Sequence, residues 1–132
     1  MKKRTVVLSC AAICIAAIVI LILALPKFQT ESTEVKPFGL NKYRRELAAF
    51  PSNKEVGRIL DERDVLAKAE QVFLETFGED VLEEKPFKLY YDEQNKVWLV
   101  TGSCPSGSQY KGGAAYLLVD EEGHVLAVWH EE

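Results

Sequence analysis

The chain has 132 residues and a formal net charge of −4, with 48% hydrophobic and 27% charged residues. This composition fits one folded domain with additional segments and excludes global disorder. Lys2, Lys3 and Arg4 place three positive charges at the start, so the rest of the chain carries 13 basic and 20 acidic residues, a balance of −7. This acidity argues against a nucleic-acid partner and favours a basic protein partner.

The N-terminal segment predicts a membrane anchor. Residues 5–25 contain no charged side chain, and Pro26 ends the run. A helix of this length spans the roughly 30 Å of a bilayer core. Bulky residues stand where a signal-peptidase site needs small ones, and Cys10 follows too short an apolar stretch for a lipoprotein. The basic residues before the span predict a cytoplasmic N-terminus and an extracytoplasmic C-terminal domain.

The chain therefore divides into four predicted parts. Residues 1–4 form a basic cytoplasmic tail, and residues 5–25 form the transmembrane anchor. Residues 26–52 are expected to be a juxtamembrane stalk with a short helix. Residues 53–132 are expected to be the folded domain.

Residues 61–77 predict the main helix of that domain. Apolar residues fall at steps of three and four and form one face: Val65, Ala69, Val72, Phe73 and Phe77. Asp61 is suited to the N-cap, and Gly78 is suited to the left-handed position just past the end.

Four strands are expected after the helix, at residues 85–92, 96–102, 113–120 and 124–130, joined in two hairpins by turns of about three residues. One helix against an antiparallel sheet is an α+β arrangement. The predicted fold is one main helix packed on a curved four-stranded antiparallel sheet, preceded by the transmembrane helix.

Three-residue turns would fix which side chains share a face of the sheet. The face toward the helix would carry Phe87, Leu89, Tyr91, Val97, Leu99, Ala115, Leu117, Val119, Val125, Ala127 and Trp129. The other face would still be apolar, with Tyr90, Trp98, Tyr116 and Leu118. Such a patch is typical of a binding or self-association surface. The alternative is that the juxtamembrane helix or the sheet's curvature covers it.

The loop between the two hairpins contains side chains that are common in active sites, but no pattern supports catalysis. Gly102 and Gly107 have the spacing of a phosphate-binding loop, yet the Lys and the following helix are missing. Ser108 and Lys111 match S-x-x-K without the helix that the motif needs. Cys104 has no recognisable spacing to either histidine for a nucleophilic pair or a metal site. We expect no catalytic, cofactor-binding or metal-binding residues.

Five pieces of sequence follow one another in order after the stalk: "DVLAKAEQVFLETFGED", "KPFKLYYD", "KVWLVTGSCP", "YKGGAAYLLVD" and "EEGHVLAVWH". Over roughly residues 61–132, this ordered set resembles the nuclear transport factor 2 (NTF2) fold immunity proteins of bacterial polymorphic toxin systems. The positions that carry this resemblance are Pro86, Phe87, Trp98, Val100, Gly102, Pro105, Gly112, Gly113, Gly123 and Val125.

The resemblance implies a non-catalytic protein that binds and neutralises a cognate toxin, which the acidic balance suggests is basic, without a cofactor or small-molecule substrate. The predicted anchor departs from the family pattern and would place this chain in the bacterial cell membrane. The expected partner-binding residues are Tyr90, Trp98, Tyr110 and Tyr116. One alternative is an exported inhibitory or sensory module of the peptidase-propeptide or YpeB type, which ends in a similar hairpin. Another is an enzyme on an NTF2-like cone, but the predicted core has no acidic residue to serve it.

Overall fold

A computed structural model describes residues 33–104 and 113–132. The elements in chain order are β1 (Val35–Pro37), the 3₁₀ helix η1 (Leu40–Tyr43), α2 (Arg44–Ala49), α3 (Glu62–Phe77), the 3₁₀ helix η2 (Glu79–Glu84), β2 (Lys88–Asp92), β3 (Val97–Thr101), β4 (Ala115–Asp120) and β5 (Val125–His130). Within the described residues no helix is long and apolar enough to cross a membrane, and the predicted anchor at residues 5–25 lies outside them.

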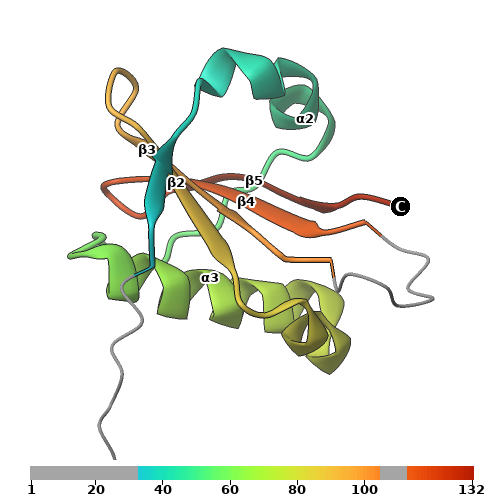
Figure 1. Cartoon of the computed structure of the whole chain (residues 1–132). Coiled ribbons are helices and arrows are strands. Elements are labelled where there is room, and N and C mark those ends of the chain that lie inside the picture. Colours follow the sequence, from blue (N-terminus) through green and yellow to red (C-terminus); the bar gives the residue numbers. More distant parts are fainter. Residues whose placement is uncertain (1–32, 105–112) are drawn as a thin grey trace, which may run out of the picture. The chain divides into compact units, whose positions relative to one another are not determined.

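The sheet has five strands in the order β1-β2-β3-β4-β5, with α3 on one face and α2 on the other (Figure 1). The four predicted strands form two antiparallel hairpins, as expected. The expectation of a four-stranded sheet is wrong by one strand, because β1 pairs in parallel with β2. This strand comes from the segment assigned to the stalk, so the folded domain begins well before residue 53.

The main helix forms where its periodicity predicts. The Asp61 side chain accepts a hydrogen bond from the backbone N–H of Asp64 at 2.8 Å, which caps the first turn. Gly78 ends the helix with a φ of 83°. The buried stripe of Val65, Ala69, Val72 and Phe73 packs on the sheet.

Two apolar clusters lie on opposite faces of the sheet. The cluster under α3 contains Leu89, Val100, Ala115, Leu117, Val119 and Val125. The cluster on the other face contains Val97, Leu99, Leu118, Ala127 and Trp129. Phe38, Leu40, Tyr43 and Leu47 pack against the second cluster from η1, α2 and the chain before them. The segment from Phe38 through α2 therefore covers part of this face, which agrees with the alternative that a short helix covers the apolar patch.

The predicted faces are wrong in β3 because the first turn holds four residues between the strands. Leu89 pairs with Val100, and Tyr90 pairs with Leu99, since residues 93–96 form the turn. The extra residue turns Trp98 toward α3, where its ring lies 4.4 Å from that of Tyr91. Val97 and Leu99 move to the opposite face. One residue in a turn exchanges every face assignment in the strand that follows.

A second correction concerns β5. Leu118 pairs with Ala127 and Val119 pairs with Val125, so the register shifts between these pairs. The bulge bends the strand and changes which side chains point to each face. Ala127 and Trp129 therefore join the second face, although the sequence placed them under the main helix.

The outer edge of β5 is covered by the segment that leads from α2 to α3. Bridges join Pro51 to Ala127 and Glu55 to His124. Gly123 permits this approach, because its φ is 88° and a Cβ there would overlap the carbonyl oxygen of Gly57. This family-motif glycine thus serves the packing of a neighbouring chain segment.

Candidate functional site

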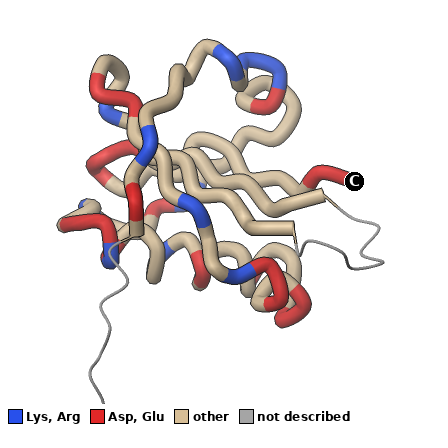
Figure 2. The backbone as a smooth tube through the Cα atoms, in the orientation of Figure 1, with Lys and Arg blue, Asp and Glu red and all other residues tan. Residues whose placement is uncertain are grey.

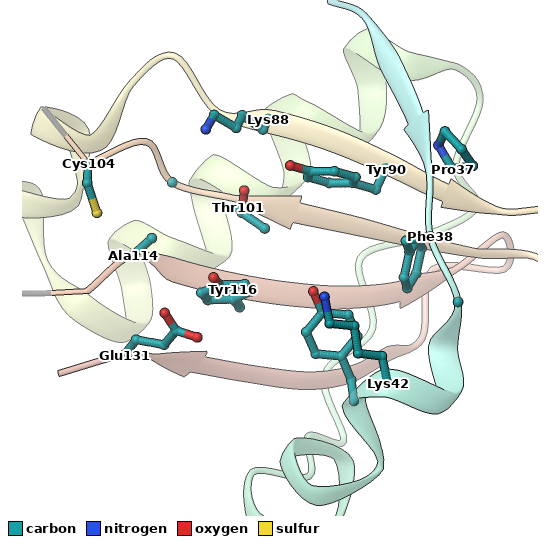
Figure 3. A pocket seen from close by; sticks show the side chains of 13 residues that line it. Pro37, Phe38, Lys42, Lys88, Tyr90, Thr101, Cys104, Ala114, Tyr116 and Glu131 are labelled. Atoms are coloured by element: carbon teal, nitrogen blue, oxygen red, sulfur yellow. The ribbon is translucent and has the colours of Figure 1, made fainter. Parts of the chain in front are cut away.

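A cleft of about 610 Å³ opens on the face of the sheet opposite α3, between the strands and the η1 segment (Figure 3). Its lining comprises Pro37, Phe38, Gly39, Lys42, Tyr43, Lys88, Tyr90, Thr101, Gly102, Cys104, Ala114, Tyr116 and Glu131. A volume of this size falls in the range of ligand-binding pockets, roughly 300–1,000 Å³.

Strand register explains why polar side chains line this cleft. Thr101 of β3 pairs with Lys88 on one side and with Tyr116 on the other. Tyr116 pairs in turn with Trp129. Directly paired residues project to the same face of a sheet. The four therefore form one row across the sheet, and Tyr90 stands on this face two residues along β2 from Lys88.

The opposite wall of the cleft is held in place by Asp92. This side chain is 5% exposed. Its carboxylate accepts the backbone N–H of Leu40 at 2.8 Å, and it also accepts from Gln94 and Asn95 in the β2–β3 turn. The side-chain amide of Asn95, followed by the N–H of Leu40, lowers the pKa of Asp92 to about 2. The charged carboxylate thus ties η1 to the sheet and fixes the wall that carries Phe38.

An aromatic cluster extends toward β5 from two tyrosines of the cleft lining, Tyr43 and Tyr116. The rings of Tyr116 and Trp129 stack with centroids 5.0 Å apart, and Tyr43 lies 5.8 Å from Trp129. Phe50 stacks on the other side of Trp129 and remains 46% exposed. Aromatic rings with polar tips are the side chains most often found at the energetic centre of protein interfaces.

The hydroxyls of Tyr43 and Tyr116 stay protonated over the neutral range. Burial, and then the charge of Glu131, raise the pKa of Tyr116 to about 12. Burial and the neighbouring Tyr90 also raise the pKa of Tyr43. The Tyr43 phenol is therefore available as a hydrogen-bond donor to a partner, whereas the Tyr116 phenol donates to Glu131.

The rim of the cleft is supported from the α3 side by a buried carboxylate. Glu84 is 1% exposed, although it lies in a stretch of acidic residues. Its Oε1 accepts the N–H of Ala115 at 2.7 Å, and its Oε2 lies 3.1 Å from Nε2 of His130. Its backbone oxygen accepts the N–H of Ser103. A Cβ at Gly102 would overlap Glu84, which explains why the rim has glycine there.

The motif positions serve the fold in different ways. Phe87, Val100 and Val125 are buried in the cluster under α3. The carbonyl of Pro86 accepts a hydrogen bond from the Ser103 hydroxyl, and Gly113 donates its N–H to Glu131 at 2.8 Å. Pro105 and Gly112 lie outside the described residues.

The structure brings together two of the four residues expected to bind a partner. Tyr90 and Tyr116 both line the cleft. Trp98 packs on the opposite face, so it does not belong to the same surface. Tyr110 lies outside the described residues, as do Ser108 and Lys111. Cys104 is exposed at the rim of the cleft.

Sequence reasoning missed the wall contributed by η1, including Phe38, Lys42 and Tyr43. A signal was present, because Phe38, Leu40, Tyr43, Leu47 and Phe50 recur at short helical steps. Within the residues that the structure describes, no group of three or more His, Cys, Asp or Glu side chains could hold a metal ion.

A family model described as NTF2 fold immunity protein matches residues 65–132. This chain belongs to that family. No curated protein and no solved structure matches it. The matched region contains most of α3 and all of η2 and β2–β5. It leaves out β1, η1 and α2, so the cleft combines a family sheet with a wall from outside the matched region.

Proposed function

We propose that this chain is a membrane-anchored immunity protein that binds a bacterial toxin domain and neutralises it by occupying it, without a catalytic step. The observation that carries the proposal is the family match over residues 65–132. It favours this function over the propeptide-like module, whose terminal hairpin is similar. The partner is the toxin domain encoded near the gene for this chain.

The proposed docking surface is the cleft with the aromatic side chains that line it. Tyr90, Tyr116 and Tyr43 present rings and hydroxyls in one concave site. Rigid aromatic side chains bury a large area on association and lose little conformational entropy. Trp98 is excluded from this surface, because it packs on the face toward α3.

Charge supports a basic partner. The residues after the N-terminal tail have a balance of −7. Figure 2 shows acidic residues in both hairpin turns and in η2, whereas basic residues mark the start of α2. An acidic surface speeds the encounter with a basic protein and orients it.

The anchor is the second part of the proposal. The uncharged run at residues 5–25 and the basic residues before it support a single span with an extracytoplasmic domain. This location suits a defence against toxin that acts at, or arrives through, the cell envelope.

Two experiments test these parts separately. Growth of cells that produce the neighbouring toxin domain in the periplasm or at the cell surface should be rescued by the full chain. Continued killing, together with no binding of the purified toxin domain, would refute neutralisation. For the anchor, the chain should stay in the membrane pellet after alkaline carbonate extraction, and its C-terminal domain should be digested by protease added to spheroplasts. Release by carbonate would refute the anchor.

A further inference from the structure

Two ammonium groups of the cleft have no carboxylate partner among the described residues. Lys42 enters from η1 and Lys88 from the start of β2, and both side chains are exposed. Three other lysines of the domain do form ion pairs: Lys54 with Glu75, Lys68 with Asp64 and Lys85 with Glu70. Lys96 also has no ion pair among the described residues, but Lys42 and Lys88 are the two lysines that line the cleft.

The carboxylate of the cleft is already engaged. Glu131 shares a side-chain hydrogen bond with Tyr116. Burial, followed by the charge of Glu131, raises the pKa of the Tyr116 phenol and keeps it protonated. No described contact joins Glu131 to Lys42 or Lys88, so the two ammonium groups remain available to a ligand.

Neutral donors surround these charges. In Figure 3 Lys88, Tyr90 and Thr101 lie next to one another on β2 and β3, Tyr116 follows on β4, and Lys42 extends from the η1 side of the cleft. Hydroxyl and ammonium groups can all donate hydrogen bonds, and an ionised carboxylate accepts up to about four. Such charge-assisted hydrogen bonds are roughly twice as strong as those between neutral groups.

We infer that the cleft receives an acidic side chain of the partner protein, with its carboxylate between Lys42 and Lys88 and against the hydroxyls of Tyr90 and Thr101. This inference rests on the proposed function for the identity of the partner, and it names the chemistry by which the partner is recognised. The acidic exterior attracts a basic toxin at long range, and the basic cleft fixes its orientation by one carboxylate. A uniformly basic protein without that carboxylate would be attracted but not held.

The first test uses the full chain in detergent micelles and needs no toxin. The probe is N-acetyl-glutamate N-methylamide, and its glutamine analogue is the uncharged control. NMR signals of the Tyr90 and Tyr116 rings should shift with the glutamate probe and not with the glutamine probe. The response should disappear in Lys42→Glu/Lys88→Glu. It should persist in Arg58→Glu/Arg63→Glu, which makes the same change in charge at exposed positions outside the cleft. Equal shifts with both probes would overturn the inference.

The second test measures the affinity of the full chain for the neighbouring toxin domain. Lys42→Glu/Lys88→Glu should weaken binding by about 30-fold or more, the cost of breaking a desolvated charge pair. Arg58→Glu/Arg63→Glu should change it by less than about threefold, and replacing the matching acidic residue of the toxin with lysine should restore binding to the cleft variant. Unchanged binding by the cleft variant would overturn the inference and leave the proposed function standing. A chain that prefers the glutamate probe but does not bind the toxin would support the cleft chemistry and refute the proposed partner.

Discussion

Replacing Gly102 with alanine should destabilise the domain through one specific neighbour, the buried Glu84. A Cβ at residue 102 would overlap Oε1 of Glu84 and would stand 3.1 Å from its Cδ and 2.9 Å from its Cβ. Gly102 does not have a left-handed φ, so the backbone itself would accept alanine. Overpacking of this kind costs about 1–3 kcal/mol.

The companion change, Glu84→Ala, removes the acceptor of the buried Ala115 N–H and the partner of His130. A buried donor left without an acceptor costs about 1–3 kcal/mol. Each single variant is therefore expected to lose about 2 kcal/mol of unfolding free energy, and additive effects would total about 4 kcal/mol. The double variant should lose only about 2–3 kcal/mol, because Glu84→Ala deletes Oε1 and Cδ and leaves a single tight contact.

Urea unfolding followed by tryptophan fluorescence measures this cycle, since both tryptophans of the chain, Trp98 and Trp129, lie in the described domain. The predicted coupling between residues 84 and 102 is about 1–2 kcal/mol. If the losses of the two single variants sum to the loss of the double variant within about 0.5 kcal/mol, the steric explanation is refuted. A Gly102→Ala variant as stable as the wild type would refute it as well.

Three further predictions concern the parts that hold the cleft and the sheet edge. Asp92→Asn should loosen the η1 wall and lower the free energy of unfolding. This loss relative to the wild type should shrink as pH falls from about 3.8 toward about 2, because a carboxyl with a lowered pKa stabilises the fold only while it is ionised. A loss that persists at pH 2 in urea unfolding would contradict this. Gly123→Ala should cost about 2–4 kcal/mol in the same assay, since it combines a left-handed φ with an overlap on Gly57, and a loss below about 1 kcal/mol would contradict the assignment. Asp120 raises the pKa of His124, so the histidine stabilises the fold fully below about pH 6.5, and this contribution is lost as pH rises through the folded pKa. His124→Gln should remove that pH dependence, and identical pH–stability curves for the variant and the wild type would contradict it.

The sequence predicts the elements of this fold better than their faces. The helix is specified locally by Asp61, by the apolar stripe and by Gly78, and each hairpin is specified by alternating side chains around a polar turn. The strand β1 has no such pattern, because it is three residues long, ends in proline and exists only through its pairing with β2. A long-range parallel pairing leaves little trace in a short sequence window.

The faces depended on details that alternation does not encode. One extra residue in the β2–β3 turn moved Trp98 from the predicted binding patch to the face under α3. A bulge in β5 moved Trp129 in the opposite direction. Glu84 shows the same limit for polar residues, because a glutamate in an acidic stretch gives no local sign that it will be buried against Ala115 and His130.

The candidate site could be predicted in part. Tyr90 and Tyr116 were expected to bind a partner, and the structure places both in the cleft. The lysines and Phe38 were not expected there, because they come together only when η1 folds back over the sheet. A site built from two distant segments becomes visible only with the topology.

The most direct test of the account is the affinity of the neighbouring toxin domain for the full chain with the cleft tyrosines removed. Tyr90→Ala/Tyr116→Ala should weaken binding by about 100-fold, the loss expected for two aromatic residues at the centre of an interface. Trp98→Ala, on the other face of the same sheet, should lower the melting temperature and leave the affinity of the folded protein unchanged. Wild-type affinity in the tyrosine variant, with a loss of affinity in folded Trp98→Ala, would contradict the assignment of the cleft as the toxin-binding surface.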